Sequence, residues 1–263
     1  MKRVYLTFLL FLSISQVFAQ DIKAIEKDLI ASFNYIDSMM VMESNSDDTT
    51  YNYRDSAIDA NERFANKLVN YCTNVPRTLT YGFPELLKEL TINIATSTDG
   101  KFRIYSWSTP FEGTMGSYVN VFQYMSNKIY ATRSYPDTVD GERMYLNPFY
   151  VDIHQLKLKD STIYICHCYL NGSSKDYSDI VQLYMIKDNV LNTKTNLIKT
   201  KSGLTSRLHF EYDRSTLPSN GQLVKCEDDG KTIKIPVVNT NQQVTNKWIT
   251  YRFDGQYFVR EKK

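Results

Sequence analysis

Residues 92–107, INIATSTDGKFRIYSW, contain the sharpest change of pattern in the chain. From Ile92 onward the hydrophobic period is two, as in β-strands, and Asp99-Gly100 interrupts the run. Asp-Gly readily takes the positive φ angles that tight hairpin turns need. The segment therefore predicts a β-hairpin, and the two-residue period continues to the C-terminus.

Further hairpin signals follow at intervals on the order of 25–40 residues, each with two strand-like runs around a short polar turn. The paired segments are 118–125 with 129–133, 151–158 with 162–170, 180–186 with a weak strand near Val190, 223–226 with 232–238, and 248–253 with 256–260. A further strand is expected at 207–212. This order predicts a long antiparallel meander.

Before Thr91, the apolar residues recur every three or four positions instead. This spacing predicts an amphipathic helix from Asp21 to Glu43 and a second helix from Tyr53 to Cys72. A polar break separates the two segments. We therefore expect an antiparallel helical pair, followed by a short turn at residues 84–90.

Helices followed by strands are typical of the α+β class. We expect residues 20–90 to form a helical segment that packs on an antiparallel β-meander of residues 91–263, with a curved, barrel-like or sandwich sheet. A partial propeller-like β-repeat is the alternative, although only the Asp-Gly turns recur. Residues 162–170 are apolar on both faces, which predicts a central strand covered on both sides, with the helices over it. Residues 207–212 are apolar on one face only.

Residues 1–19 have the pattern of a secretory signal peptide. A basic start precedes an apolar run, and Val17 and Ala19 are small residues at the positions that a signal peptidase inspects. We expect cleavage between Ala19 and Gln20 and export to the periplasm or the outside of a bacterial cell. A membrane anchor is the rival interpretation, but polar residues interrupt the run below the roughly 20 apolar residues that a span requires.

The chain holds 31 Lys and Arg against 29 Asp and Glu, and cleavage would remove Lys2 and Arg3. The mature chain is then neutral, without an overall field that attracts nucleic acid or an anionic membrane. No later segment is long and apolar enough to predict a transmembrane helix. The expected partner is a protein or a carbohydrate.

The four cysteines are scattered, at Cys72, Cys166, Cys168 and Cys226. Export would permit disulfides, with three pairings open, but the spacing favours small buried side chains. Cys166-His167-Cys168 has the residue types of a zinc site. In a strand His167 points away from both cysteines, so no metal is expected. Signatures of nucleotide-binding loops, serine hydrolases and zinc proteases are absent, and no cofactor is expected.

Two long loops, residues 110–116 and 136–143, carry carboxylates. A glycosidase needs two carboxylates at the right distance, so these loops could form its active site. The candidates are Glu112, Asp137, Asp140 and Glu142. The second loop could also hold calcium, although the regular oxygen spacing of a calcium loop is missing. A solvated turn is the simpler interpretation.

Aromatic residues make up 13% of the chain and concentrate in the predicted strands. An exposed row of such rings binds sugars or protein partners, and core packing is the alternative. The candidate binding face comprises Arg103, Tyr105, Trp107, Tyr118, Phe122 and Tyr124. The sequence thus favours a non-enzymatic exported binding or surface-interaction module over a secreted glycan-active hydrolase or a structural component of the cell envelope.

Overall fold

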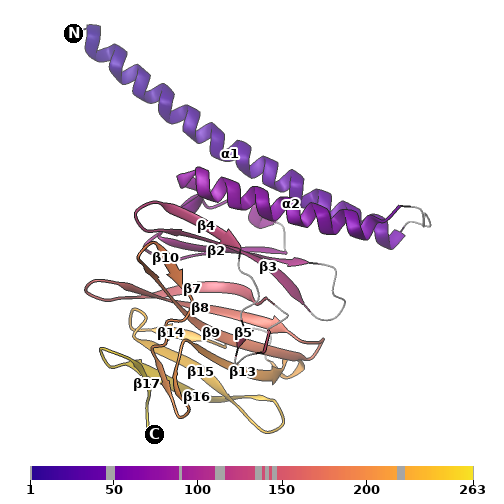
Figure 1. Cartoon of the computed structure of the whole chain (residues 1–263), viewed down its shortest axis with the longest axis vertical. Helices are drawn as coiled ribbons and strands as arrows, with labels where there is room; N and C mark the ends of the chain where they lie inside the picture. Colours follow the sequence, from indigo (N-terminus) through magenta and orange to yellow (C-terminus); the bar gives the residue numbers. More distant parts are fainter. Residues whose placement is uncertain are drawn as a thin grey trace. The chain divides into compact units, whose positions relative to one another are not determined.

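The computed structural model describes residues 2–45, 51–88, 91–109, 116–133, 138–139, 142–143, 147–217 and 223–262. The chain forms two compact units, unit 1 (Met1–Leu90) and unit 2 (Thr91–Lys263). Unit 1 is helical, and unit 2 consists of β-sheets (Figure 1). The predicted α+β class is confirmed.

Unit 1 is built on two long helices, α1 (Lys2–Asn45) and α2 (Tyr53–Asn74). They are antiparallel, as predicted, because Phe64 contacts Phe33, whereas Tyr71, farther along α2, contacts Asp28, farther back along α1. The helix α1 begins before the predicted start at Asp21, and its described buried residues begin at Ile22. Two short 3-10 turns follow α2, η1 (Pro76–Leu79) and η2 (Leu86–Lys88). Among the described residues, no helix is both long enough and apolar enough to cross a membrane.

Glu26 connects α1 to the segment that follows α2. Its carboxylate is only 4% exposed and accepts hydrogen bonds from the Tyr81 hydroxyl at 2.8 Å and from the backbone N–H groups of Glu85 and Leu86 at 2.9 and 3.2 Å. A charge can be buried at low cost only when its hydrogen-bonding capacity is filled in this way. The η2 turn therefore begins against a fixed carboxylate.

Unit 2 contains three larger sheets, which we name by their order along the chain. The first sheet consists of β1 (Ile92–Thr96), β2 (Phe102–Thr109), β3 (Ser117–Met125) and β4 (Ile129–Arg133). The middle sheet consists of β7 (Phe149–Lys157), β8 (Thr162–Asn171), β9 (Asp176–Lys187), β10 (Val190–Asn192) and β13 (Arg207–Asp213), with β13 paired to β9. The predicted hairpins of these segments are confirmed.

The last sheet has the order β12-β11-β17-β16-β15-β14. Its strands are β11 (Ile198–Thr200), β12 (Gly203–Thr205), β14 (Lys225–Glu227), β15 (Thr232–Val238), β16 (Val244–Phe253) and β17 (Phe258–Arg260). The pairing of β11 with β17 is parallel, which the predicted meander does not contain. Two short strands, β5 (Thr138–Val139) and β6 (Glu142–Arg143), pair separately, and a 3-10 turn, η3 (Arg214–Thr216), follows β13.

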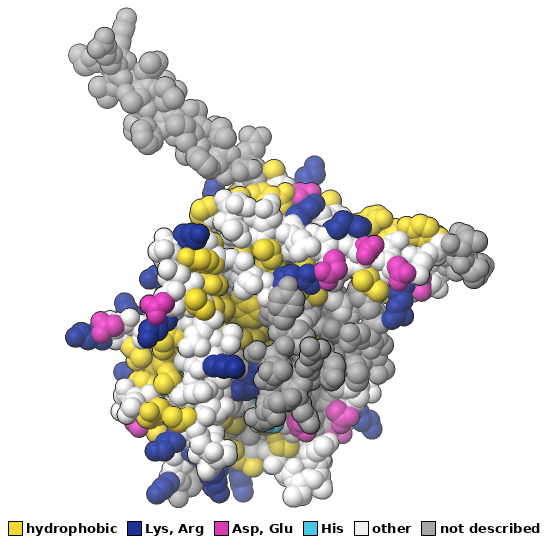
Figure 2. Space-filling view, viewed as in Figure 1, with side chains coloured by type: hydrophobic (Ala, Val, Ile, Leu, Met, Phe, Trp, Pro, Cys, Tyr) yellow, Lys and Arg dark blue, Asp and Glu magenta, His cyan; other side chains and the backbone are white. Residues whose placement is uncertain are grey.

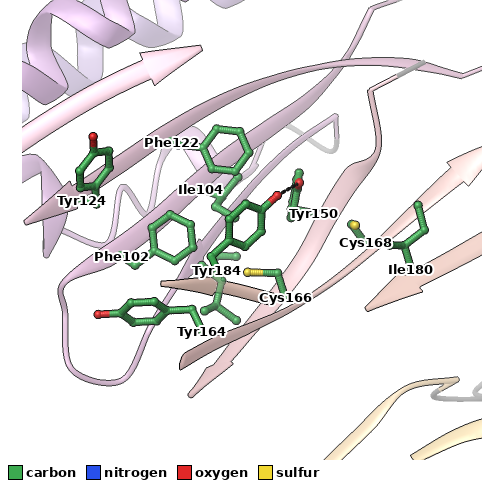
Figure 3. Close-up of a cluster of buried hydrophobic side chains, with 12 residues drawn as sticks. Phe102, Ile104, Phe122, Tyr124, Tyr150, Tyr164, Cys166, Cys168, Ile180 and Tyr184 are labelled. Carbon is green, nitrogen blue, oxygen red and sulfur yellow. Dashed lines mark hydrogen bonds between the residues drawn. The ribbon is translucent and has the colours of Figure 1, made fainter. Parts of the chain in front are cut away.

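The three sheets stack face to face, with the middle sheet between the other two (Figure 1). Only β13 departs from chain order, since it joins the middle sheet after β11 and β12 of the last sheet. Tyr164 and Cys166 of β8 join an apolar cluster with Phe102 and other residues of the first sheet (Figure 3). Ile163 and Ile165, which alternate with them, join a second cluster with residues of the last sheet. The prediction of a central strand covered on both sides is confirmed, but the cover comes from strands of unit 2, where we expected helices.

This stack is a sandwich, one of the expected forms, and it does not show the propeller-like repeat. The cysteine prediction is also confirmed: all four thiols are free, and those of Cys72, Cys166 and Cys168 are buried. Burial raises the pKa of Cys166 well above its ordinary value, so that thiol stays protonated inside the core.

Candidate functional site

The predicted aromatic binding face does not exist as one surface. The antiparallel register pairs Phe102 with Tyr124 and Ile104 with Phe122, so these rings share the face of the first sheet that meets the middle sheet. Tyr118 lies on the same face, in ring contact with Phe149 of β7 at 5.2 Å. Three of the six predicted residues are therefore core residues between two sheets.

The other three predicted residues, Arg103, Tyr105 and Trp107, alternate with these rings and point to the opposite face. They are at most 3% exposed. The Arg103 Nε donates to Thr96 Oγ1 at 2.8 Å, and the Tyr105 hydroxyl donates to Gln123 Oε1 at 3.3 Å. The six residues therefore do not share one face of the sheet, and a ligand-binding role for them stays a prediction.

The predicted catalytic carboxylates cannot be placed in a site. Glu112, Asp137 and Asp140 lie outside the described residues, and only the backbone of Glu142, in β6, is described. Their proposed role in glycoside hydrolysis stays a prediction.

A row of ionisable side chains crosses the middle sheet, and we call it the His-Asp row. It contains His154 and Asp152 of β7, His167 of β8, Asp179 of β9 and Tyr212 of β13. His154 Nε2 lies 3.4 Å from Asp152 Oδ1, and His167 Nδ1 lies 4.0 Å from Asp152 Oδ2. His167 Nε2 is paired with Asp179 Oδ1, and the Tyr212 hydroxyl donates to Asp179 Oδ2 at 2.5 Å. Two of the three histidines of the chain thus belong to one connected group.

A β-bulge brings Asp152 into the His-Asp row. Tyr150 pairs with Cys168 and Asp152 pairs with His167, so Val151 is an extra residue in β7. Because of this bulge, Tyr150 points towards the first sheet, whereas Asp152 lies on the side of the middle sheet that meets the last sheet. His167 points away from Cys168, as predicted from strand alternation.

The pKa values of two members of the row, Tyr212 and His154, are shifted by their neighbours. Asp179 is only 3% exposed, and both of its carboxyl oxygens have hydrogen-bond partners, as burial of a polar group requires. Burial, followed by the neighbouring Asp179 carboxylate, raises the pKa of Tyr212, which therefore remains a proton donor. The contact with Asp152 raises the pKa of His154 above its ordinary value of 6.5, against an opposing effect of partial burial.

Within the His-Asp row, the His167 ring is held between two carboxylates. Both ring nitrogens of His167 face carboxylates, whereas a general base needs a nitrogen directed at the group that it deprotonates. Within the described parts of the chain, no three His, Cys, Asp or Glu side chains are arranged to hold a metal ion. The clearest consequence of the row is a fixed orientation for Tyr212.

A pocket of about 330 Å³, which we call the tyrosine pocket, opens at one end of β8, β9 and β13. Its apolar lining comes mainly from Leu170, Tyr177 and Tyr212. Asp176, Glu211 and Gln242 supply polar groups. Gln242 belongs to the β15–β16 turn of the last sheet, and the backbone N–H of Asp213 donates to its carbonyl at 2.8 Å, which fixes this wall.

Tyr177 lies between other aromatic and cationic groups. Its ring centroid is 6.0 Å from that of Tyr169 and 6.3 Å from that of Tyr212. The guanidinium of Arg214 lies 4.4 Å from the Tyr177 centroid, in a cation–π contact. The pocket thus combines a fixed aromatic wall with a positive charge beside it.

A second pocket, of about 600 Å³, lies at the His154 end of the row. It is lined by charged groups, including Lys157 of β7 and the turn at Asp228 and Asp229 between β14 and β15. The His-Asp row therefore runs from the mainly apolar tyrosine pocket to this charged pocket.

No protein-family model, curated protein or solved structure matches the chain. The function must therefore be argued from the geometry. Sequence patterns missed the tyrosine pocket because its residues come from separate strands and a distant turn, and only strand alternation around His167 pointed to this face of β8.

Proposed function

We propose that the chain is an exported, non-enzymatic binding protein and that the tyrosine pocket is its ligand site. The ligand class is a small compound with an apolar ring face and several hydroxyl groups, which is the chemistry of a monosaccharide unit. One observation carries the proposal: the apolar wall of the pocket contains Tyr212, whose hydroxyl is held from behind by Asp179.

The size and lining of the pocket support this ligand class. Small-molecule sites have volumes of about 300–1,000 Å³ and a mainly apolar lining with a few polar groups, and the tyrosine pocket is at the small end of this range. Aromatic rings suit the apolar face of a sugar. The carboxylates of Asp176 and Glu211 can accept hydrogen bonds from its hydroxyl groups, and the amide of Gln242 can both accept and donate them.

Pre-organisation supports a binding role over a catalytic one. Tyr212 is fixed by Asp179, and Tyr177 is fixed by Arg214 and two neighbouring rings. A wall that is ordered before the ligand arrives loses little side-chain entropy on binding.

Export is the second part of the proposal, and it rests on the leader pattern of residues 1–19. The described buried residues of α1 begin at Ile22, after the proposed cleavage site at Ala19. Removal of the leader would leave those packed residues in the mature chain.

Saturation-transfer NMR with glucose, galactose and N-acetylglucosamine tests the ligand site. We expect a signal from at least one sugar, and we expect Tyr177→Ala to weaken binding at least about tenfold because it removes the central ring. Tyr257→Ala, in the β16–β17 turn, is the matched control and should bind as the wild type does. Absence of a signal from all three sugars, or a signal unchanged by Tyr177→Ala, contradicts the proposal.

A further inference from the structure

The last sheet has one face in the core and one face directed outward. Ile198, Ile233 and Phe258 pack in the cluster with the middle sheet. Strand alternation and the observed register therefore place the residues between them on the other side. We call this side the outward face, and it carries Lys199, Lys225, Lys234, Trp248, Thr250 and Arg252.

The part of the chain that builds the last sheet is basic. Residues 193–205 and 223–262 contain ten Lys and Arg against five Asp and Glu, a net charge of five positive. The mature chain as a whole would be neutral, so the remainder carries an equal negative charge. Figure 2 shows Lys and Arg side chains at the lower end of the view, where Figure 1 draws β15, β16 and β17.

Some of the charges on the outward face are paired. Lys234 Nζ lies 2.6 Å from Glu227, and Arg252 bridges Asp228 at 3.1 Å and Glu261 at 2.7 Å. Exposed pairs of this kind contribute little to stability. Because these pairs neutralise Lys234 and Arg252, the net positive charge of this part of the chain lies on its other lysines.

Lys225 makes a cation–π contact, because its ammonium lies 4.5 Å from the ring centre of Trp248. The Trp248 ring is half-buried, so part of its surface remains accessible. Lys225 pairs with Lys234, and Lys234 pairs with Thr250, across neighbouring strands about 4.8 Å apart. The Trp248 ring, the Lys225 ammonium, the ion-paired Lys234 ammonium and the Thr250 hydroxyl thus lie side by side on the outward face.

From this arrangement we infer that the outward face binds an acidic polysaccharide, with Trp248 stacked on a sugar ring and Lys225 paired with a carboxylate. Lys199, exposed on β11, extends the positive surface along the polymer. A membrane is less suited, because interfacial binding requires apolar side chains that insert beyond the charges. This site is separate from the tyrosine pocket, and neither proposal depends on the other.

Isothermal titration with polygalacturonate at low salt tests the inference on the purified protein. We expect Trp248→Ala to weaken binding at least about tenfold and Lys225→Gln to weaken it about three- to fivefold. Added salt should also weaken binding, since exposed charges are screened. Lys159→Gln, in the exposed β7–β8 turn, removes one charge elsewhere and should bind as the wild type does.

Circular dichroism checks that the Trp248→Ala variant is folded. If Trp248→Ala is unfolded, the Lys225→Gln variant alone tests the inference. Tyr177→Ala should retain polygalacturonate binding, which separates this site from the tyrosine pocket. The inference is overturned if polygalacturonate does not bind, or if Lys159→Gln weakens binding as much as Lys225→Gln does. Equal or tighter binding to phosphatidylglycerol vesicles or to oligodeoxythymidylate also overturns it.

Discussion

One residue, Val151, determines which side chains meet on the middle sheet. Without an extra residue in β7, Asp152 would share the face of Tyr150 and enter the core beside the first sheet. With it, Asp152 lies between His154 and His167. A one-residue change in register thus creates a connected group of ionisable side chains.

The titration of His154 provides a test of this group. We expect its pKa to lie above 6.5, because the Asp152 carboxylate favours the protonated imidazole. Asp152→Asn should lower that pKa towards 6.5. The measurement is the pH dependence of the His154 imidazole signals by NMR.

The sign of the linked stability follows from the same shift. The pKa of His154 is higher in the folded protein than in the unfolded chain. Its contribution to the free energy of unfolding is therefore fully present below pH 6.5 and is lost as the pH rises through the pKa of the folded protein. Asp160→Asn, in the exposed β7–β8 turn, is the control and should leave the His154 titration unchanged. A His154 midpoint at or below 6.5 in the wild type would rule out the proposed ion pair.

At the scale of elements, the β14–β15 turn docks tightly against β7. Asp228, Asp229 and Gly230 all have positive φ angles, of 53°, 53° and 82°. A Cβ atom at Gly230 would lie 2.3 Å from the backbone oxygen of Gln155. Glycine is therefore required both by the backbone conformation and by the close approach of the two sheets.

Gly230→Ala should lower the free energy of unfolding of unit 2 by about 3 kcal/mol, from backbone strain and displacement of the turn from β7. Urea unfolding followed by tryptophan fluorescence measures it, because both tryptophans, Trp107 and Trp248, belong to unit 2.

Gly255→Ala is the matched control for this substitution. Gly255 also has a positive φ, of 107°, but a Cβ there would meet no atom within 4 Å. Its substitution should cost only the strain, about 1–2 kcal/mol. Equal losses for the two variants would show that the contact between the turn and β7 contributes nothing.

At the scale of the whole molecule, local patterns predicted the elements well. The change from helical to strand period at Thr91, and the turns at Asp99-Gly100 and Asp254-Gly255, depend on residues close together in the sequence. The stacking of the sheets, the bulge at Val151 and the parallel pairing of β11 with β17 depend on distant contacts. No local pattern carries that information.

The candidate binding residues were harder to predict than the fold. Tyr105 and Phe122 satisfy the composition of an aromatic face, but the register places them on opposite sides of the sheet. Tyr177 and Gln242 belong to one pocket although they come from different sheets. Composition identifies aromatic residues, and only the pairing of strands shows which of them share a surface.

The leader gives a prediction for the whole chain. Expressed in a bacterial host with its leader intact, the protein should be recovered from the periplasm or the medium with Gln20 at its N-terminus, as measured by intact mass. Ala19→Arg should retain the full-length mass, because a large charged residue does not fit the recognition site of the peptidase. Recovery of the wild type with residues 1–19 intact would contradict export by this route.

If the chain is exported as we propose, the stacking of the three sheets has a consequence for how it acquires its structure. A polypeptide threaded through a channel emerges gradually from its N-terminal end, and the parts that emerge first can fold first. Here the first sheet precedes the other two in the chain, and β7 to β10 of the middle sheet precede every strand of the last sheet, whereas β13 follows β11 and β12. The middle sheet, apolar on both sides, is exposed on one side only for the time that the next segment takes to arrive. In an exported chain, this order would limit the time for which an apolar sheet face is open to aggregation.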